Sequence, residues 1–210
     1  MSILAVVPAK GESRRLLGKN LRTIGGETLV ELAIKYAKSS ERVTDVVVST
    51  DSEEVRQFVE SKKLCQCILR GSELSGETDV FFVYQHAWEE KGKEAEYVVG
   101  LQPDNPDRTL SLDTAVSYVL ENNLDNFFTV NKNGRKNGSI RMYRPNVESF
   151  CQTSTLLDDC TNIHTEDDLN RASRIMLVNP NPLNLSPTEV FVIAEAACNH
   201  MCSIELAKAM

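Results

Sequence analysis

Short apolar runs rich in β-branched residues alternate with segments of helical periodicity along most of this chain. The continuous run Val46-Val47-Val48 is typical of a strand that is buried on both faces, whereas residues 29–37 repeat their apolar side chains along one helical stripe. This alternation predicts an α/β fold in three layers, in which a mainly parallel, twisted sheet lies between helices on both faces. The alternating segments are residues 3–7, 29–37, 46–49, 53–59, 65–69, 80–89, 97–101, 112–120 and 127–130.

The pattern changes after residue 130. Residues 131–138 are turn-forming types, and residues 140–143 can form a further strand, so we expect a late or antiparallel member of the sheet. Thr165 precedes three acidic residues, which is typical of a helix N-cap with an acidic first turn. A helix is therefore predicted from there to Ile175.

The chain is predicted to divide near residue 179. Its 210 residues are 41% hydrophobic, which allows residues 1–178 to bury the core of one domain. The prolines and asparagines of residues 179–189 predict a linker. Residues 190–210 then form a separate segment.

The charge balance limits the classes of partner. Thirty acidic residues against 23 basic ones give a net charge of −7, which argues against binding to nucleic acid or to an anionic membrane surface. No apolar run approaches the roughly 18 residues of a membrane span, and the N-terminus does not resemble a signal peptide. We therefore expect a cytoplasmic protein.

Six cysteines occur, and we expect them to be free thiols because no secretory signal and no pair of zinc knuckles accompanies them. Cys198, His200 and Cys202 lie close together in the sequence, but a fourth zinc ligand is absent nearby.

The loop that follows the first predicted strand, residues 8–20, has the composition of a phosphate site; we call it the opening loop. It contains Gly11 and Gly18, which permit close approach of the backbone, so amide groups can point at phosphate oxygens. Its cations are Lys10, Arg14, Arg15 and Lys19. Ligands of open α/β sheets bind at the carboxyl ends of strands, although a solvated basic turn has the same composition.

The order of residues in this loop, P-A-K-G-E-S-R-R-L-L-G-K-N-L, resembles the N-terminal signature of the acylneuraminate cytidylyltransferases. Around residues 13–16 it also resembles the related 3-deoxy-manno-octulosonate cytidylyltransferases. Residues 46–54, 69–78 and 101–109 resemble later family segments in the same order, and the resemblance covers roughly residues 1–178. It implies the Rossmann-like fold of the nucleotide-diphospho-sugar transferases.

The resemblance also implies an activity: a 2-keto-3-deoxy sugar acid attacks the α-phosphorus of CTP, giving a CMP-sugar and pyrophosphate with Mg²⁺ or Mn²⁺. The nucleotide-binding residues that it implies are Pro8, Ala9, Lys10, Ser13, Arg14, Lys19, Asn20 and Arg70. Gln102 and Arg108 are expected to contact the sugar, because a guanidinium can pair both oxygens of a carboxylate. Lys19, Arg14 and His164 are the candidate catalytic residues.

Several of these residues also have a structural interpretation. Arg70 can cap a strand end, and Arg108 can form a surface salt bridge with Asp104 or Asp107. Ser13 and Asn20 can be turn or cap residues without a ligand.

The sequence departs from the family pattern at the metal site. The family carries two aspartates before its last helix, where this chain has Asn162 and His164. Asp104 aligns with a metal-binding aspartate of the octulosonate enzymes and supplies the hard oxygen that Mg²⁺ prefers. We expect the metal at Asp104, with His164 as a ligand or general base; His164 can equally be an inert residue beside the helix.

Two further features bear on partners. Only eight residues separate Val130 from Ser139, where the sialic-acid enzymes have a longer segment that shapes the sugar pocket and contributes to dimerisation. Residues 190–210 resemble the opening strand and first helix of the sialic acid synthases, which suggests the first part of a longer two-enzyme polypeptide.

The sequence thus favours a cytidylyltransferase that binds CTP and a sialic-acid-like sugar and forms a homodimer fused to a synthase. One alternative is a catalytically silent nucleotide-binding or partner domain of that synthase. Another is a cytidylyltransferase for a different acidic sugar, such as 3-deoxy-manno-octulosonate.

Overall fold

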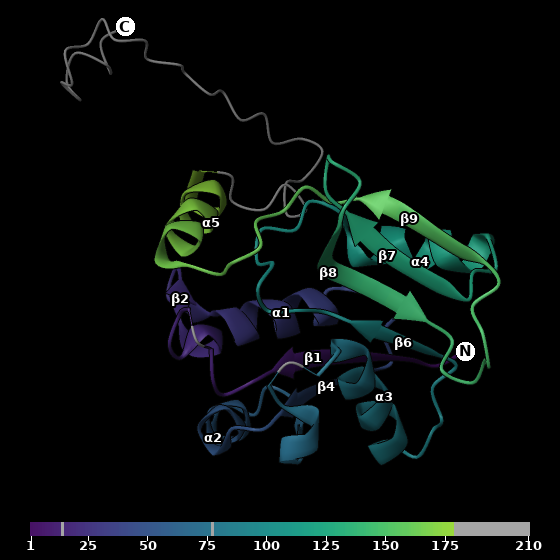
Figure 1. Cartoon of the computed structure of the whole chain (residues 1–210), viewed down its shortest axis with the longest axis horizontal. Coiled ribbons are helices and arrows are strands. Elements are labelled where there is room, and N and C mark those ends of the chain that lie inside the picture. The colour runs from purple at the N-terminus through teal and green to yellow at the C-terminus, as the bar shows by residue number, and fades with distance from the viewer. Residues whose placement is uncertain (14, 77, 179–210) are drawn as a thin grey trace, which may run out of the picture. The chain divides into compact units, whose positions relative to one another are not determined.

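The computed structural model describes residues 1–13, 15–76 and 78–178 (Figure 1). Arg14, the predicted linker 179–189 and the predicted segment 190–210 lie outside the described residues, so the predictions made for them stay predictions. None of the helices in the described part is long and apolar enough to cross a membrane.

Seven strands of the described chain form one mixed sheet in the order β5-β4-β1-β6-β8-β7-β9. Strands β5, β4, β1 and β6 run parallel, β8 is antiparallel to both of its neighbours, and β9 is parallel to β7. The strands are β1 (Ile3–Ala9), β4 (Asp45–Thr50), β5 (Gln66–Leu69), β6 (Tyr97–Gly100), β7 (Asn126–Val130), β8 (Lys136–Tyr143) and β9 (Thr153–Leu157). The hairpin of β2 (Thr23–Ile24) and β3 (Glu27–Thr28) stands apart from this sheet.

Helices cover both faces of the sheet, so the predicted fold class is confirmed. Side chains of α1, α2 and α4 pack with Ile3, Ala5 and Val7 of β1 in one core cluster. The alternate residues Leu4 and Val6 point to the opposite face, where α3 covers them, because successive side chains of a strand point to opposite sides. The helices are α1 (Leu29–Lys38), α2 (Glu53–Ser61), α3 (Val80–Glu90), α4 (Leu112–Glu121) and α5 (Glu166–Val178), with 3-10 turns η1 (Lys19–Leu21) and η2 (Ser72–Leu74).

The order of the strands defines where a ligand can enter. The chain passes from β1 through β4 to β5 on one side and then returns to place β6 on the other side of β1. This reversal at β1 is a topological switch point, and the loops at the carboxyl ends of the adjoining strands diverge there.

The later part of the domain agrees only in part with the sequence. The helix after Thr165 is confirmed: the Asp168 amide donates to Thr165 Oγ1 (3.3 Å), and the Thr165 amide donates to Asp168 Oδ2 (2.9 Å). The antiparallel strand is also confirmed, but it begins at Lys136, so the last three residues of the predicted turn at 131–138 belong to β8. Strand β9 was not predicted.

The four cysteines of the described residues, Cys65, Cys67, Cys151 and Cys160, are free thiols, as expected. Cys198 and Cys202 lie outside the described residues.

Gly100, the last residue of β6, should not tolerate a side chain. A Cβ atom there would lie 2.2 Å from Cζ of the buried Tyr84 ring, so Gly100→Ala should destabilise the domain by about 1–3 kcal/mol through overpacking. Thermal unfolding checks this, with Gly100→Ala repeated in a Tyr84→Leu background, where the penalty should shrink. An equal penalty in both backgrounds would show that the ring is not the cause.

Candidate functional site

An open cavity of about 1000 Å³ lies at the carboxyl ends of β1 and β4, on the switch point of the sheet. Three parts of the chain form most of its wall: the opening loop, the residues that follow β4, and the loop after β5. The lining residues are Pro8, Lys10, Gly11, Glu12, Ser13, Arg15, Lys19, Asn20, Asp51, Ser52, Arg70, Ser72, Leu74, Ser75, Gly76, Thr78, Val80, Val83, Gln102, Asp104 and His164.

The opening loop is closed by its own side chains. Asn20 is buried, and its Nδ2 donates to the carbonyl of Lys10 (2.7 Å), which joins the two ends of the loop. Gly18 adopts a left-handed conformation (φ 60°) just before η1, which a residue with a side chain rarely adopts. Asn20 therefore stabilises the loop, as its structural interpretation predicted, and it also lines the cavity.

Lys19 forms a buried ion pair inside the cavity. Its Nζ lies 2.5 Å from Asp104 Oδ2 and donates to the carbonyl of Ile163 (3.2 Å). The two side chains are 7% and 16% exposed, so this pair is shielded from screening by water. It connects the opening loop to the segment after β6 and to the approach to α5.

His164 is held beside this pair by a second cation. Its Nδ1 accepts a hydrogen bond from Arg15 Nη2 (3.1 Å), because a guanidinium can only donate. Burial lowers the pKa of His164, and the positive charges of Arg15 and Lys19 lower it further. The imidazole is therefore neutral at neutral pH and carries its proton on Nε2 in this arrangement.

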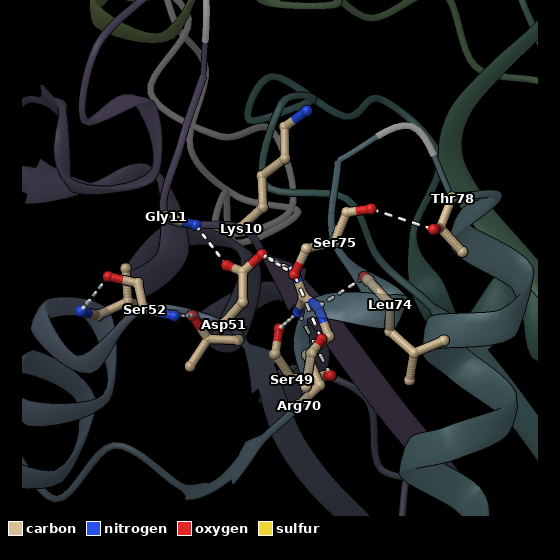
Figure 2. Close-up of polar contacts among 12 residues, drawn as sticks. Lys10, Gly11, Ser49, Asp51, Ser52, Arg70, Leu74, Ser75 and Thr78 are labelled. Atoms are coloured by element: carbon tan, nitrogen blue, oxygen red, sulfur yellow. Dashed lines mark hydrogen bonds and ion pairs between the residues drawn. The ribbon is translucent and has the colours of Figure 1, made fainter.

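A second network joins the β4 end to the loop after β5 (Figure 2). Arg70 is buried, and its Nε donates to the carbonyl of Leu74 (3.1 Å), while its Nη1 donates to the carbonyl and hydroxyl of Ser49. Its Nη2 pairs with Asp51 Oδ2 (3.5 Å). Most N–H donors of Arg70 thus contact other groups of the protein, although the residue lines the cavity.

Asp51 is the centre of this network, and the sequence analysis did not single it out. Its Oδ1 accepts from the amide of Gly11 (2.7 Å), and its Oδ2 accepts from Ser75 Oγ (2.5 Å). Partial burial alone would raise the pKa of Asp51, but the hydrogen bonds from Ser75 and Gly11 and the charge of Arg70 outweigh it and lower that pKa.

One amide of the opening loop already has a partner within the protein. The sequence predicted that amides of this loop can point at phosphate, and the Gly11 amide instead donates to Asp51 (Figure 2). Lys10, the neighbouring residue, extends away from that carboxylate.

Of the two residues expected at the sugar, only Gln102 lines the cavity. Arg108 is 8% exposed, and its guanidinium donates to the backbone carbonyls of Gln102 (2.6 Å) and Ser139 (3.1 Å) while it stacks over the ring of Tyr36. Arg108 therefore braces the backbone beside the cavity instead of facing it, and it makes no surface salt bridge of the kind considered from the sequence within the described residues.

The nucleotide-binding residues expected from the sequence are placed unevenly. Pro8, Lys10, Ser13, Lys19, Asn20 and Arg70 line the cavity. Ala9, the last residue of β1, does not line it, and its side chain is fully buried in the core. Arg14 lies outside the described residues.

The side chains present do not build a protein cage for a metal ion. No group of three His, Cys, Asp or Glu side chains in the described residues is arranged to bind one. Asp104 offers a carboxylate, but one of its oxygens contacts Lys19, and His164 is bonded to Arg15. Asp104 could hold Mg²⁺ only together with a bound polyphosphate, whose oxygens would supply further ligands. Mg²⁺ is commonly held in this way, by one or two carboxylates together with phosphates and water.

A family comparison places this cavity in context. The family described as cytidylyltransferase matches residues 4–185. The chain belongs to the cytidylyltransferase family. A 3-deoxy-manno-octulosonate cytidylyltransferase of Acidobacterium capsulatum is 33% identical over 121 residues, which are 58% of this chain and 47% of that protein. A CMP-N,N'-diacetyllegionaminic acid synthase of Legionella pneumophila is 37% identical over 78 residues, 37% of this chain and 34% of that protein.

Two solved structures share the fold of this chain. A CMP:2-keto-3-deoxy-manno-octonic acid synthetase complexed with CTP superposes with a TM-score of 0.69 over 85% of this chain and 99% of that one, at 16% identity. A cytidylyltransferase of Leptospira borgpetersenii gives 0.66 over 85% and 88%, at 20% identity. The chain spans about half the length, or less, of the curated relatives that it matches in sequence.

Close packing at Gly11 fixes the course of the opening loop in this member of the cytidylyltransferase family. A Cβ atom at residue 11 would lie 2.7 Å from Ser52 Cβ, so Gly11→Ala should lower the melting temperature by about 2–4 °C for each kcal/mol of strain. Ser52→Gly removes the opposing atom, and at a helix N-cap glycine costs only about a few tenths of a kcal/mol. The double variant should therefore melt above Gly11→Ala; a melting temperature equal to or below that of Gly11→Ala would refute the packing argument.

Proposed function

We propose that this chain is a CTP-dependent cytidylyltransferase that transfers CMP to a 2-keto-3-deoxy sugar acid and releases pyrophosphate. The observation that carries this proposal is the cavity at the strand ends, in which Lys10, Arg15 and Lys19 of one loop face the same space. Clustered cations in a partly closed cavity stabilise a triphosphate far better than they do when dispersed in water.

The class of acceptor is supported by the names of the relatives. The Acidobacterium protein is named for 3-deoxy-manno-octulosonate and the Legionella protein for a diacetyllegionaminic acid, so both names point to acidic sugars. We propose a sialic-acid-like nine-carbon acid and 3-deoxy-manno-octulosonate as the two acceptors to compare. Gln102, beside Asp104 in the cavity wall, is the proposed sugar contact.

In the proposed reaction, a hydroxyl oxygen of the sugar forms a bond to the α-phosphorus of CTP. The bond between that phosphorus and the oxygen bridging to the β-phosphate breaks, and pyrophosphate leaves with the electron pair. Lys10, Lys19 and Arg15 stabilise the negative charge that builds on the phosphate oxygens. The Pro8 backbone and Ser13 line the same cavity and are proposed to position the nucleotide.

The proton of the attacking hydroxyl needs an acceptor. His164 is neutral and lies in the cavity, but its Nδ1 is occupied by Arg15. We propose that Arg15 transfers its hydrogen bond to phosphate when CTP binds, which frees Nδ1 to act as general base. A Mg²⁺ ion that accompanies the triphosphate would be held by Asp104 and would offset phosphate charge.

A catalytically silent nucleotide-binding domain is the second candidate function. It is favoured by Asn162 and His164, which stand where the resemblance predicts two aspartates, and by the pairing of Asp104 with Lys19. Pyrophosphate release separates the two candidates, measured with CTP and a panel of nonulosonic and octulosonic acids. CTP binding without turnover on any acceptor supports the silent domain, and turnover with one acid identifies the substrate.

Lys19→Met should weaken CTP binding by about tenfold or more, because a charge-assisted phosphate contact is lost and Asp104 is left without its cation. Calorimetric titration with CTP measures the effect. Without added Mg²⁺, Lys19→Met with Asp104→Asn should bind CTP more tightly than Lys19→Met alone, since the unpaired anion is gone. Lys91→Met is the matched control, because Lys91 pairs with Asp45 and does not line the cavity; CTP affinity equal to wild type in Lys19→Met would refute the assignment.

Asp104→Asn should lower pyrophosphate release by about tenfold or more and abolish the gain in CTP affinity on adding Mg²⁺, because the hard anionic oxygen is removed while the shape is kept. Titrations with Mg²⁺ and Mn²⁺ measure both effects. Asp159→Asn serves as a control, since Asp159 does not line the cavity.

Replacing Asn162 by Asp, which keeps the proposed base His164 in place, should act in the opposite direction and raise metal-dependent turnover. Undiminished turnover and an unchanged Mg²⁺ response in Asp104→Asn would overturn the role of Asp104.

A further inference from the structure

Two loops face each other across the cavity, and one carboxylate stands between them. Strand β4 lies between β1 and β5, and Thr50 at its end is in register with Ala9 of β1 and Leu69 of β5. The opening loop continues from β1, and a second loop, described at residues 70–76 and 78–79, continues from β5. Asp51, the first residue after β4, therefore occupies the position from which both loops can be reached.

The two oxygens of Asp51 divide their contacts between these loops. Oδ1 accepts the Gly11 amide of the opening loop (2.7 Å), and Oδ2 accepts Ser75 Oγ of the second loop (2.5 Å) (Figure 2). The loop partners are 40 and 24 residues away in the sequence.

Each loop is held near its contact with Asp51 by further contacts. In the second loop, Thr78 Oγ1 donates to the carbonyl of Ser75 (3.0 Å), and Arg70 Nε donates to the carbonyl of Leu74 (3.1 Å). In the opening loop, the close approach to Ser52 leaves room only for glycine at residue 11. A displacement of Asp51 would therefore move whole loop segments and not single side chains.

The charge of Asp51 argues against direct contact with a polyanion. Both of its oxygens are engaged, and its charge is offset by the buried guanidinium of Arg70. A bare carboxylate at this place would repel a triphosphate. Its contribution to binding must therefore come from geometry and not from its own electrostatic field.

We propose that Asp51 is a positioning residue that couples the two walls of the nucleotide cavity, so that CTP binding requires both loops to be fixed through its carboxylate. This inference rests on the proposed function, because CTP is the ligand whose affinity reports the coupling.

The test compares the CTP affinities of the wild type, Asp51→Asn, Ser75→Ala and the double variant by calorimetry, with the melting temperature of each recorded in parallel. Asp51→Asn should weaken CTP binding about tenfold, because a hydrogen-bonded charged group is lost. Ser75→Ala should weaken it about threefold, and the double variant should bind no more weakly than Asp51→Asn, because Ser75 acts through Asp51.

The direction of the change in CTP affinity distinguishes a positioning role of Asp51 from a simple effect of its charge. Removing a negative charge beside a site for a triphosphate would by itself tighten binding. Glu53→Gln gives this charge effect alone, since Glu53 lies two residues further on and pairs with Arg56 on the outer face of α2. It should leave CTP affinity unchanged or slightly raised.

Each outcome decides the question. Wild-type CTP affinity in Asp51→Asn, tighter binding like that of Glu53→Gln, or additive losses in the double variant would overturn the positioning role. If Asp51→Asn does not fold, wild-type affinity in a folded Ser75→Ala would overturn it as well. A wild-type protein that binds no CTP would refute the proposed function itself, which is a different result from a wild type that binds and an Asp51→Asn that binds equally well.

Discussion

Parallel pairing of β1 with β4 and β6 is the constraint on which the rest of the structure depends. Parallel strands end at the same edge of a sheet, so residues that are tens of positions apart leave the core side by side. The apolar alternation of β1 fixes this register, because a shift by one residue would turn Leu4 and Val6 toward the wrong set of helices. The cavity is a consequence of that register.

Two cations of the cavity are compensated by carboxylates within the protein. Lys19 is paired with Asp104 and Arg70 with Asp51, whereas Arg15 donates a hydrogen bond to the neutral His164. Burying a charge without a partner is costly, so removing one member of either ion pair would destabilise this part of the structure. The proposed triphosphate would draw cations away from their present partners, and the exposed Arg15 can change partner at a smaller cost than the buried Arg70.

The sequence predicted the sheet well where strands are buried on both faces, since apolar content alone marks such strands. It missed β9, because Thr153–Leu157 is an edge strand whose residues are exposed or half-buried and which pairs with β7 alone. It selected Lys10 and Lys19 from the cationic composition of the opening loop and from the family resemblance, and both line the cavity. It did not identify Asp51, because the segment after β4 carries several carboxylates and nothing in the sequence shows which of them turns toward the cavity.

Arg108 shows that a residue can occupy its position in a family motif and yet contact the protein backbone and not the cavity. The guanidinium donates hydrogen bonds to the carbonyls of Gln102 and Ser139, and it thereby connects the segment after β6 to β8. Loss of activity in an Arg108 variant would therefore have two possible causes. A displaced backbone at Gln102 and a missing substrate contact would both abolish turnover. The thermal unfolding of such a variant distinguishes a structural role of Arg108 from a ligand contact. Mutational surveys that measure turnover alone would not separate these two roles.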